Sequence, residues 1–270
     1  MKTRIIASAV LVPILLLVVL AAPKPVAAVI FGLLLAIGVY ELLFRTGLVK
    51  HPRLVLYSSV MAFFISLWSC FGAVHAVAVL GILVFFMLLF AETMADHVRV
   101  RFDMLGMCML AGLVIPYLLS ALIRILAMKI GRYMILVPFV VAFASDAGAY
   151  FVGIRFGKRK LAPVVSPNKT IEGLLGGIAA AMVGMLFYGL ILHLLDFQVN
   201  FLLALLYGLV GSLAGVFGDL CFSAVKRQTG IKDYGDLIPG HGGVLDRFDS
   251  VTTVAPLMEA LLALIPFAVG

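Results

Sequence analysis

The sequence predicts an all-α, polytopic integral membrane protein with about nine transmembrane helices. Of its 270 residues, 64% are apolar and only 12% are charged, about half the charged fraction of soluble domains. The apolar residues also gather into stretches close to the roughly 20 residues that cross a bilayer. These stretches cover residues 5–22, 25–43, 54–71, 74–91, 104–125, 133–153, 171–195, 200–222 and 251–270.

The first stretch has two interpretations. Lys2 and Arg4 precede it and small residues end it, as in a cleavable signal peptide. However, Pro23 follows directly and many further stretches come after it. We therefore expect the first transmembrane helix here, joined to the second by a tight hairpin.

The distribution of the 20 Lys and Arg residues predicts that the amino terminus is cytoplasmic. With that orientation, only Lys24, Arg124, Lys129 and Arg132 lie outside. The two long polar connections, residues 154–170 and 223–250, then both face the cytoplasm. Because topology alone explains the net charge of +7, we expect no nucleic-acid partner.

The unusual residues are unevenly distributed along the chain. We expect an amino-terminal helical region over residues 1–132, containing spans one to five, and a catalytic region over residues 133–270, containing spans six to nine and both polar loops. The three cysteines, Cys70, Cys108 and Cys221, are too far apart for a disulfide framework or a metal-type spacing. We expect them to be buried small hydrophobic residues.

Asp146 and Asp219 fall within the sixth and eighth predicted spans, near their inner ends. An aspartate at the centre of a membrane helix costs roughly 2.5–3.5 kcal/mol. The simple alternative is that each acid caps a helix, reaches the interface, or bonds to a hydroxyl such as that of Ser145 or Ser212. Two acids at one depth, each beside a basic loop, favour a shared function instead.

Two glutamates in apolar stretches, Glu41 and Glu259, are weaker candidates. Glu41 lies at a predicted helix end beside Arg45, so we expect it to have a capping or packing role rather than a chemical one.

Glycines spaced four residues apart predict close packing of the later helices. Gly173 with Gly177, and Gly211 with Gly215, form small-xxx-small pairs. A homodimer through these helices is a further expectation.

The first polar loop predicts a helix start that can also bind an anion. Ser166 followed by Pro167 suits a cap and the first helical position, and Glu172 suits the positive amino end of the helix. Lys169 and Thr170 beside that end indicate a phosphate contact.

The second polar loop mixes acids, bases and glycines. Mg2+ prefers one or two carboxylates together with substrate phosphates and water, and glycines such as Gly242 and Gly243 allow a close approach of the backbone. This mixture therefore favours a metal-bound polyphosphate. The chain has no P-loop, no dinucleotide fingerprint, and no His and Cys metal spacing. The loop's charged residues are Lys226, Arg227, Lys232, Asp233, Asp236, His241, Asp246, Arg247 and Asp249.

The signature segment, residues 223–249, resembles that of the phosphatidate cytidylyltransferases, also called CDP-diacylglycerol synthases. The matching positions are Ser223, Lys226–Arg227, Lys232–Asp233, Gly235, Leu237 or Ile238, Pro239, His241–Gly242–Gly243 and Asp246–Arg247–Phe248–Asp249. Upstream, Asp146, Tyr150, Gly153, Gly157 and the stretch SPNKTIEG are also similar to that family. The resemblance covers roughly residues 140–250, whereas the first 130 residues resemble the family only in being helical and apolar.

This resemblance implies a Mg2+-dependent reaction of CTP with phosphatidic acid, giving CDP-diacylglycerol and pyrophosphate at the cytoplasmic face of a bacterial inner membrane. It implies that Asp219 and Asp246 hold Mg2+, with or without a second cation, and that Asp146 completes or orients the shell. Membrane lipids would surround the protein. The residues implied to position the triphosphate or to catalyse are Lys226, Arg227, Lys232, His241 and Arg247, and those implied to contact substrate are Lys169, Thr170, Ser223, Asp233, Gly242, Gly243 and Asp249.

Two other functions use similar residues. A secondary transporter for an anionic solute also needs intramembrane acids, but would place them near mid-bilayer and show related halves. A CTP-using lipid kinase is the nearer rival, because it shares the nucleotide. A scaffold protein has no need of such a loop.

Overall fold

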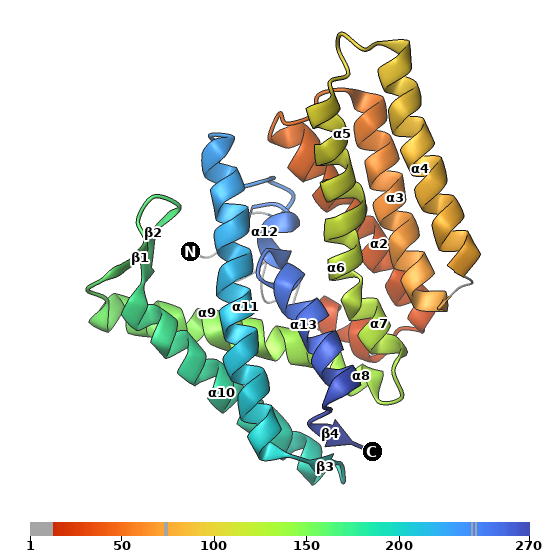
Figure 1. The fold of residues 1–270 in the computed structure, drawn as a ribbon. Coiled ribbons are helices and arrows are strands. Elements are labelled where there is room, and N and C mark those ends of the chain that lie inside the picture. The colour runs from red at the N-terminus through yellow and green to blue at the C-terminus, as the bar shows by residue number, and fades with distance from the viewer. Residues whose placement is uncertain (1–12, 73–74, 239, 241) are drawn as a thin grey trace. The chain divides into compact units, whose positions relative to one another are not determined.

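The structure is a computed structural model that describes residues 13–72, 75–238, 240 and 242–270. Most of this part of the chain is helical (Figure 1). Seven of the described helices are long and apolar enough to cross a membrane, which confirms the predicted class of helical membrane protein. The structure adds two short antiparallel two-stranded sheets. The described chain divides into two compact units.

Unit 1 comprises the described residues up to Ala127 together with residues 228–248. Its long helices lie side by side (Figure 1), and α2 and α3 are in extensive contact. Proline begins α3 at its first helical position, and Gly72, in the left-handed conformation, ends it. The elements of unit 1 are α2 (Lys24–Tyr40), the π-helix η1 (Glu41–Arg45), α3 (Pro52–Phe71), α4 (His75–Ala95), α5 (Phe102–Met109), the π-helix η2 (Leu110–Val114), α6 (Ile115–Leu119), α7 (Ala121–Ala127) and α12 (Leu245–Phe248).

Unit 2 comprises residues 128–227 and 249–270. The β1–β2 hairpin joins α9 to α10, and these two helices pack closely along their lengths (Figure 1). The elements of unit 2 are α8 (Gly131–Met134), α9 (Leu136–Phe156), β1 (Lys160–Ala162), β2 (Ser166–Thr170), α10 (Ile171–Leu194), β3 (Gln198–Val199), α11 (Phe201–Gln228), α13 (Val251–Leu264) and β4 (Ala268–Val269).

The predicted glycine pairs do bring helices of unit 2 together. A Cβ atom on Gly177 would lie 2.8 Å from the Ser145 carbonyl oxygen on α9. One on Gly173 would lie 2.9 Å from the Ala149 carbonyl oxygen. On α11, a Cβ atom on Gly211 would meet side chains of α9 and α13 at 2.7 and 2.8 Å. These distances leave no room for a side chain, so the prediction of close packing is confirmed.

The predicted spans agree with the structure in the middle of the chain and differ at its ends. The seven spans from residue 25 to residue 222 each have a matching helix. The first stretch is helical over residues 13–20, and its start lies outside the described residues. The single helix predicted over residues 251–270 is wrong, because α13 ends at Leu264 and β4 then pairs with β3. At 1.5 Å per residue, its 14 residues extend only about 21 Å, short of a hydrocarbon core of about 30 Å.

The predicted end of the first polar loop at residue 170 is confirmed, but the helix start predicted at Ser166 and the predicted start of the second loop are wrong. Ser166 and Pro167 do not begin a helix; they lie in β2, and α10 begins at Ile171 with Thr170 as its cap. The second loop does not begin at residue 223, because α11 continues to Gln228. Lys226 and Arg227 therefore lie in the last turn of a helix.

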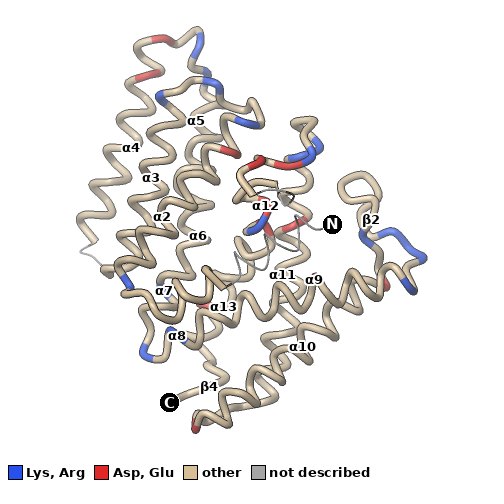
Figure 2. Tube along the Cα trace, turned by 180° about the vertical axis from the view of Figure 1, so that it is seen from behind, with Lys and Arg blue, Asp and Glu red and all other residues tan. Residues whose placement is uncertain are grey.

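Charged side chains in unit 1 gather at a connection between helices, whereas Asp146 and Asp219 of unit 2 lie within α9 and α11. Figure 2 shows Lys, Arg, Asp and Glu residues together where α4 connects to α5 in unit 1. Arg53 and Tyr57 of α3 both contact Glu92 of α4 near this end, at 3.4 and 2.9 Å. The polar connections are thus separated from the apolar helix bodies, as a membrane protein requires.

Candidate active site

The part of the signature segment that lies in unit 1, residues 232–248, forms a compact turn that we call the signature turn. The amide of Ile238 donates to the carbonyl oxygen of Gly242 at 2.9 Å, which closes a small loop. Gly240 and Gly242 have φ values of +76° and +83°, a conformation that residues with a side chain rarely adopt. The chain then enters the short helix α12 at Leu245.

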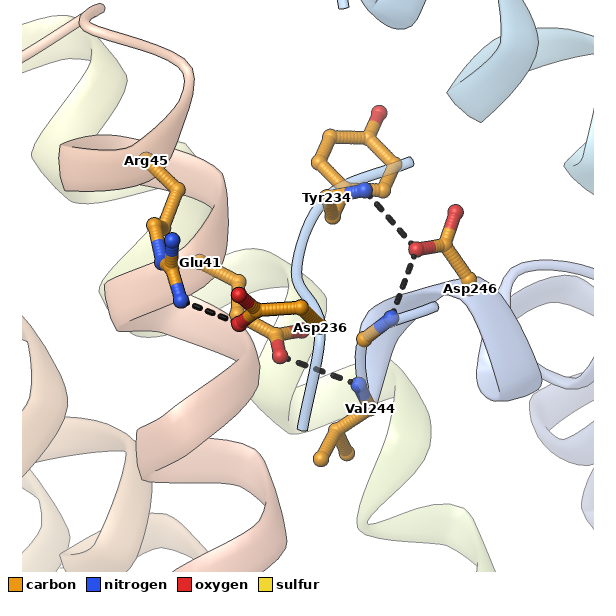
Figure 3. Close-up of polar contacts among 7 residues, drawn as sticks. Glu41, Arg45, Tyr234, Asp236, Val244 and Asp246 are labelled. Carbon is orange, nitrogen blue, oxygen red and sulfur yellow. Dashed lines mark hydrogen bonds and ion pairs between the residues drawn. The ribbon is translucent and has the colours of Figure 1, made fainter. Parts of the chain in front are cut away.

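Asp246 is a buried carboxylate fixed by the backbone of this turn. Its side chain is 7% exposed, and its Oδ2 atom accepts hydrogen bonds from the amides of Tyr234 at 2.8 Å and Gly243 at 3.0 Å (Figure 3). Bonds from backbone amides to an ionised carboxylate are among the stronger hydrogen bonds in proteins. Asp246 therefore has a defined orientation that depends on the fold of the turn.

The glycines beside Asp246 leave room for its carboxylate. A Cβ atom on Gly242 would lie 2.9 Å from Asp246 Oδ2, so a side chain there would displace the carboxylate. The Gly243 amide donates to Asp246 Oδ2. These glycines allow the backbone to surround an acid of the protein itself.

A charged pocket of about 460 Å3 opens beside the signature turn. This volume lies within the roughly 300–1,000 Å3 of typical small-molecule sites. Four of the predicted site residues contribute to it: Lys232, Asp233, Gly242 and Arg247. The remaining lining residues are Gly235, Asp236, Ile238 and Gly240. The signature turn thus brings basic and acidic side chains together around a space of nucleotide size.

In unit 2, Asp219 lies on α11 and forms an ion pair with Lys169 of β2. Both side chains are 25% exposed. The Ser223 hydroxyl, one helical turn further on, donates to Asp219 Oδ1 at 3.1 Å. Lys169 was predicted to contact a phosphate, and in this structure its partner is the acid that was predicted to bind metal.

Asp249 lies close to two other acids of unit 2. Burial and the charges of Asp219 and Asp146 together raise the pKa of its carboxyl to about 7, against the opposing effects of a hydrogen bond from the Ser250 amide and the charge of Lys226. A cation placed among these acids would relieve their repulsion. Nevertheless, no three His, Cys, Asp or Glu residues in the described part of the chain lie close enough to form a metal site.

Comparison with known proteins identifies the family of this chain. The model of the cytidylyltransferase family matches residues 2–265. The chain belongs to the cytidylyltransferase family. The family resemblance found in the signature segment is therefore confirmed, and it extends to the first 130 residues, where the sequence alone gave only a helical likeness.

Individual relatives of this chain agree with that assignment. A phosphatidate cytidylyltransferase of Bacillus subtilis (strain 168) is 35% identical over 268 residues, which cover 98% of each chain. Phosphatidate cytidylyltransferases of Staphylococcus haemolyticus (strain JCSC1435) and Staphylococcus aureus (strain COL) are each 46% identical over 132 residues. Those two matches span 49% of this chain and about half of the staphylococcal proteins.

Other predicted residues contact their own chain. The Thr170 hydroxyl is buried and accepts from the Gly173 amide at 3.1 Å, which caps α10. Glu172 accepts from the amides of Lys158 and Arg159. Arg227 donates to the Val165 carbonyl oxygen at 3.2 Å. These contacts hold the hairpin against the ends of α10 and α11.

The structure also shows the partners of Ser145 and Ser212 and the burial of the cysteines. The hydroxyls of Ser145 and Ser212 bond to each other at 2.7 Å, and the hydroxyl bonded to Asp219 is that of Ser223. Cys108 is buried as expected, but Cys221 is exposed, and all three cysteines are free. His241 lies outside the described residues.

Sequence reasoning missed the contribution of the first helices to this site. Glu41 and Arg45, both in η1, contact the signature turn about 200 residues further along the chain (Figure 3). The only sequence signal was a charged pair at the end of an apolar stretch, which suggested a capping role for Glu41. That role is confirmed, since Glu41 accepts from the amides of Val244 and Leu245 at the start of α12.

Proposed function

We infer that this protein is a phosphatidate cytidylyltransferase, which transfers cytidylate from CTP to phosphatidic acid and releases pyrophosphate. The observation that carries this inference is the pocket of about 460 Å3 lined by signature residues in a chain of the cytidylyltransferase family. The relative aligned over 98% of this chain is named for the same activity.

The reaction joins a lipid to a water-soluble nucleotide. The seven long apolar helices suit a substrate whose acyl chains stay in the bilayer. We propose that the protein lies in the bacterial inner membrane with the pocket toward the cytoplasm, where CTP is available. The excess of Lys and Arg on the predicted inner side supports this orientation.

We propose that Mg2+ binds to Asp219 and Asp246, with Asp146 completing or orienting the ligand shell, and with or without a second cation. Two observations fit a divalent ion. Backbone amides fix the Asp246 carboxylate, and repulsion among the acids of unit 2 contributes to the raised pKa of Asp249. When bound, the ion would supply positive charge that stabilises the phosphates and the leaving group.

In the proposed reaction, an oxygen of the phosphatidate phosphate attacks the α-phosphorus of CTP, and the bond to the pyrophosphate oxygen breaks. The attacking phosphate is already ionised, so no general base is needed. The main task of the protein is to bring two anions together. Lys232 and Arg247 line the pocket and would orient the triphosphate, together with Lys226, Arg227 and His241. The other proposed substrate contacts are Lys169, Thr170, Ser223, Asp233, Gly242, Gly243 and Asp249.

The decisive experiment offers purified protein each of the four nucleoside triphosphates with phosphatidic acid and Mg2+. We expect only CTP to yield equal amounts of pyrophosphate and of cytidine nucleotide that extracts into organic solvent. Release of free CDP with a phosphorylated lipid would identify a lipid kinase instead. Uptake of an anionic solute into sealed vesicles without any product would identify a transporter.

A homodimer is also part of the proposal. Gly173, Gly177 and Gly211 pack against helices of their own chain, so a dimer would use other faces of α10 and α11. Light scattering of the detergent-solubilised protein, corrected for bound detergent, measures the number of chains.

A further inference from the structure

The π-helix η1 places two charged side chains against the signature turn. It follows α2 directly and spans five residues, Glu41–Arg45. Glu41 and Arg45 both reach the turn, and Arg45 pairs there with Asp236. Short π-helical segments inside longer helices are frequent at functional sites. The Arg45–Asp236 pair is exposed, whereas Glu41 is only 3% exposed.

The buried Glu41 carboxylate bonds to two consecutive amides of the turn. Oε1 accepts from the Val244 amide at 3.1 Å (Figure 3), and Oε2 accepts from the Leu245 amide at 2.9 Å. A buried charge is stable only when its hydrogen-bonding capacity is satisfied. Glu41 therefore holds the start of α12 through backbone amides.

The glycines of the signature turn provide independent evidence for this arrangement. A Cβ atom on Gly243 would lie 2.5 Å from Glu41 Oε2. For a Cβ atom on Gly235, the nearest atom would be Glu41 Oε1. Two signature glycines are thus required by the space that the Glu41 carboxylate occupies.

The same few residues also hold Asp246. The Gly243 amide donates to Asp246 Oδ2, and the next two amides along the chain donate to Glu41. Three consecutive amides therefore connect the two carboxylates. A change at Glu41 alters the backbone that fixes Asp246.

We propose that Glu41 is a positioning residue for the transferase reaction: it sets the backbone of residues 243–245 and thereby the orientation of the Asp246 carboxylate. This proposal rests on the proposed function, in which Asp246 binds Mg2+. Glu41 itself contacts neither substrate nor ion. Through Glu41, the amino-terminal helices would influence the reaction by positioning Asp246.

The test compares Glu41→Gln with Glu92→Gln in the same unit. Glutamine keeps the size of the side chain but turns an NH2 group toward one of the two amides, so that donor faces donor. Glu92 is a matched control, because it is a mostly buried carboxylate, 12% exposed, that pairs with Arg53 and Tyr57 on α3. These partners of Glu92 lie on α3 and not in the signature turn.

For Glu41→Gln we expect kcat to fall about 10- to 100-fold, the size of effect seen when a residue supporting a metal ligand is lost. We also expect a higher Mg2+ concentration for half-maximal rate, with the KM for CTP within about twofold of wild type. Glu92→Gln should keep both kcat and the Mg2+ requirement per folded molecule. A merely structural role for Glu41 would lower the folded fraction but leave the Mg2+ requirement of the remaining enzyme unchanged.

A folded Glu41→Gln protein with wild-type kcat and Mg2+ requirement would overturn the proposal, as would losses equal to those of Glu92→Gln. If Glu41→Gln does not fold, Glu41→Asp provides the same test, because it keeps the charge and shortens the reach by one methylene. We expect it to give a smaller rise in the Mg2+ requirement, and wild-type behaviour would again overturn the proposal. If the wild-type protein forms no lipid-linked cytidylate in this assay, the proposed function fails, whatever the variants do.

Discussion

The two acids proposed to bind Mg2+ are held in different ways in the two units. Asp246, in unit 1, accepts hydrogen bonds from two backbone amides of its own turn. Asp219, in unit 2, has a lysine and a serine side chain as partners. Backbone amides cannot leave without unfolding the turn, whereas a lysine side chain can exchange one anion for another. Asp246 is therefore the more rigidly held of the two acids, whereas the lysine partner of Asp219 can be exchanged more readily.

The largest expected effect is the loss of either acid. Asp246→Asn and Asp219→Asn should each lower the rate of CDP-diacylglycerol formation by at least about 100-fold, because charge stabilisation at the reacting phosphates is lost. Size-exclusion profiles in detergent should remain those of the wild-type protein. Near-normal activity in both variants would refute the metal assignment for both units.

The next effect concerns the rigidity of the turn around Asp246. Gly242→Val puts a β-branched residue at a φ of +83° and a Cβ atom 2.9 Å from Asp246 Oδ2. Displacement of the Asp246 carboxylate should reduce activity at least about tenfold, and backbone strain of about 1–3 kcal/mol should lower the apparent melting temperature. Gly230→Val is the control, because Gly230 also has a positive φ, +70°, but no atom lies within 4 Å of its Cβ position. Equal activity losses in the two variants would show that strain alone, and not Asp246, is responsible.

A smaller effect tests whether the lysine partner of Asp219 is exchangeable. Lys169→Met removes the ion pair, so Mg2+ no longer competes with Lys169 for Asp219. We expect a lower Mg2+ requirement and a KM for CTP raised about threefold to tenfold, as for one lost charge-assisted hydrogen bond. Lys160→Ala, at the exposed start of the hairpin, should change neither value by more than about twofold. An unchanged KM in Lys169→Met would assign Lys169 to structure alone.

The smallest effect is a dependence of stability on pH that belongs to unit 2. The pKa of Asp249 is raised from 3.8 to about 7, so between these values the folded state binds more protons than the unfolded state. Stability should therefore fall as the pH rises through this window, and the loss is complete above about pH 7. Asp249→Asn should flatten the fall in apparent melting temperature between pH 5 and pH 8, measured with a metal chelator present. An unaltered slope would mean that Asp249 is not held in a buried, acidic surrounding.

The sequence predicted the helical membrane class and the position of seven spans well, because long apolar stretches have few alternatives to a membrane helix. Short sequence patterns were less reliable where the same pattern occurs in more than one kind of local structure. Ser166 followed by Pro167 is typical of a helix start, yet the pair lies in β2 because the cap is supplied by Thr170. The end of α11 was also misplaced, since polarity begins at residue 223 while the helix continues for another turn and a half.

Sequence reasoning identified several residues of the site but not the residues that they contact. Lys232, Asp233, Gly242 and Arg247 were correctly grouped, because they are close in the chain and the structure gathers them around one pocket. The link between Glu41 and Val244 spans 203 positions, and no local pattern reports such a contact. The pairing of Lys169 with Asp219 likewise depends on how a hairpin meets a distant helix.

The length of α11 bears on the proposed contacts of Lys226 and Arg227 with the triphosphate. Its 28 residues extend about 42 Å, roughly 12 Å more than a hydrocarbon core. Lys226 and Arg227 therefore lie in the last turn of a regular helix instead of in a flexible connection. Since the backbone beneath them is ordered before any anion arrives, little conformational entropy is lost there on binding.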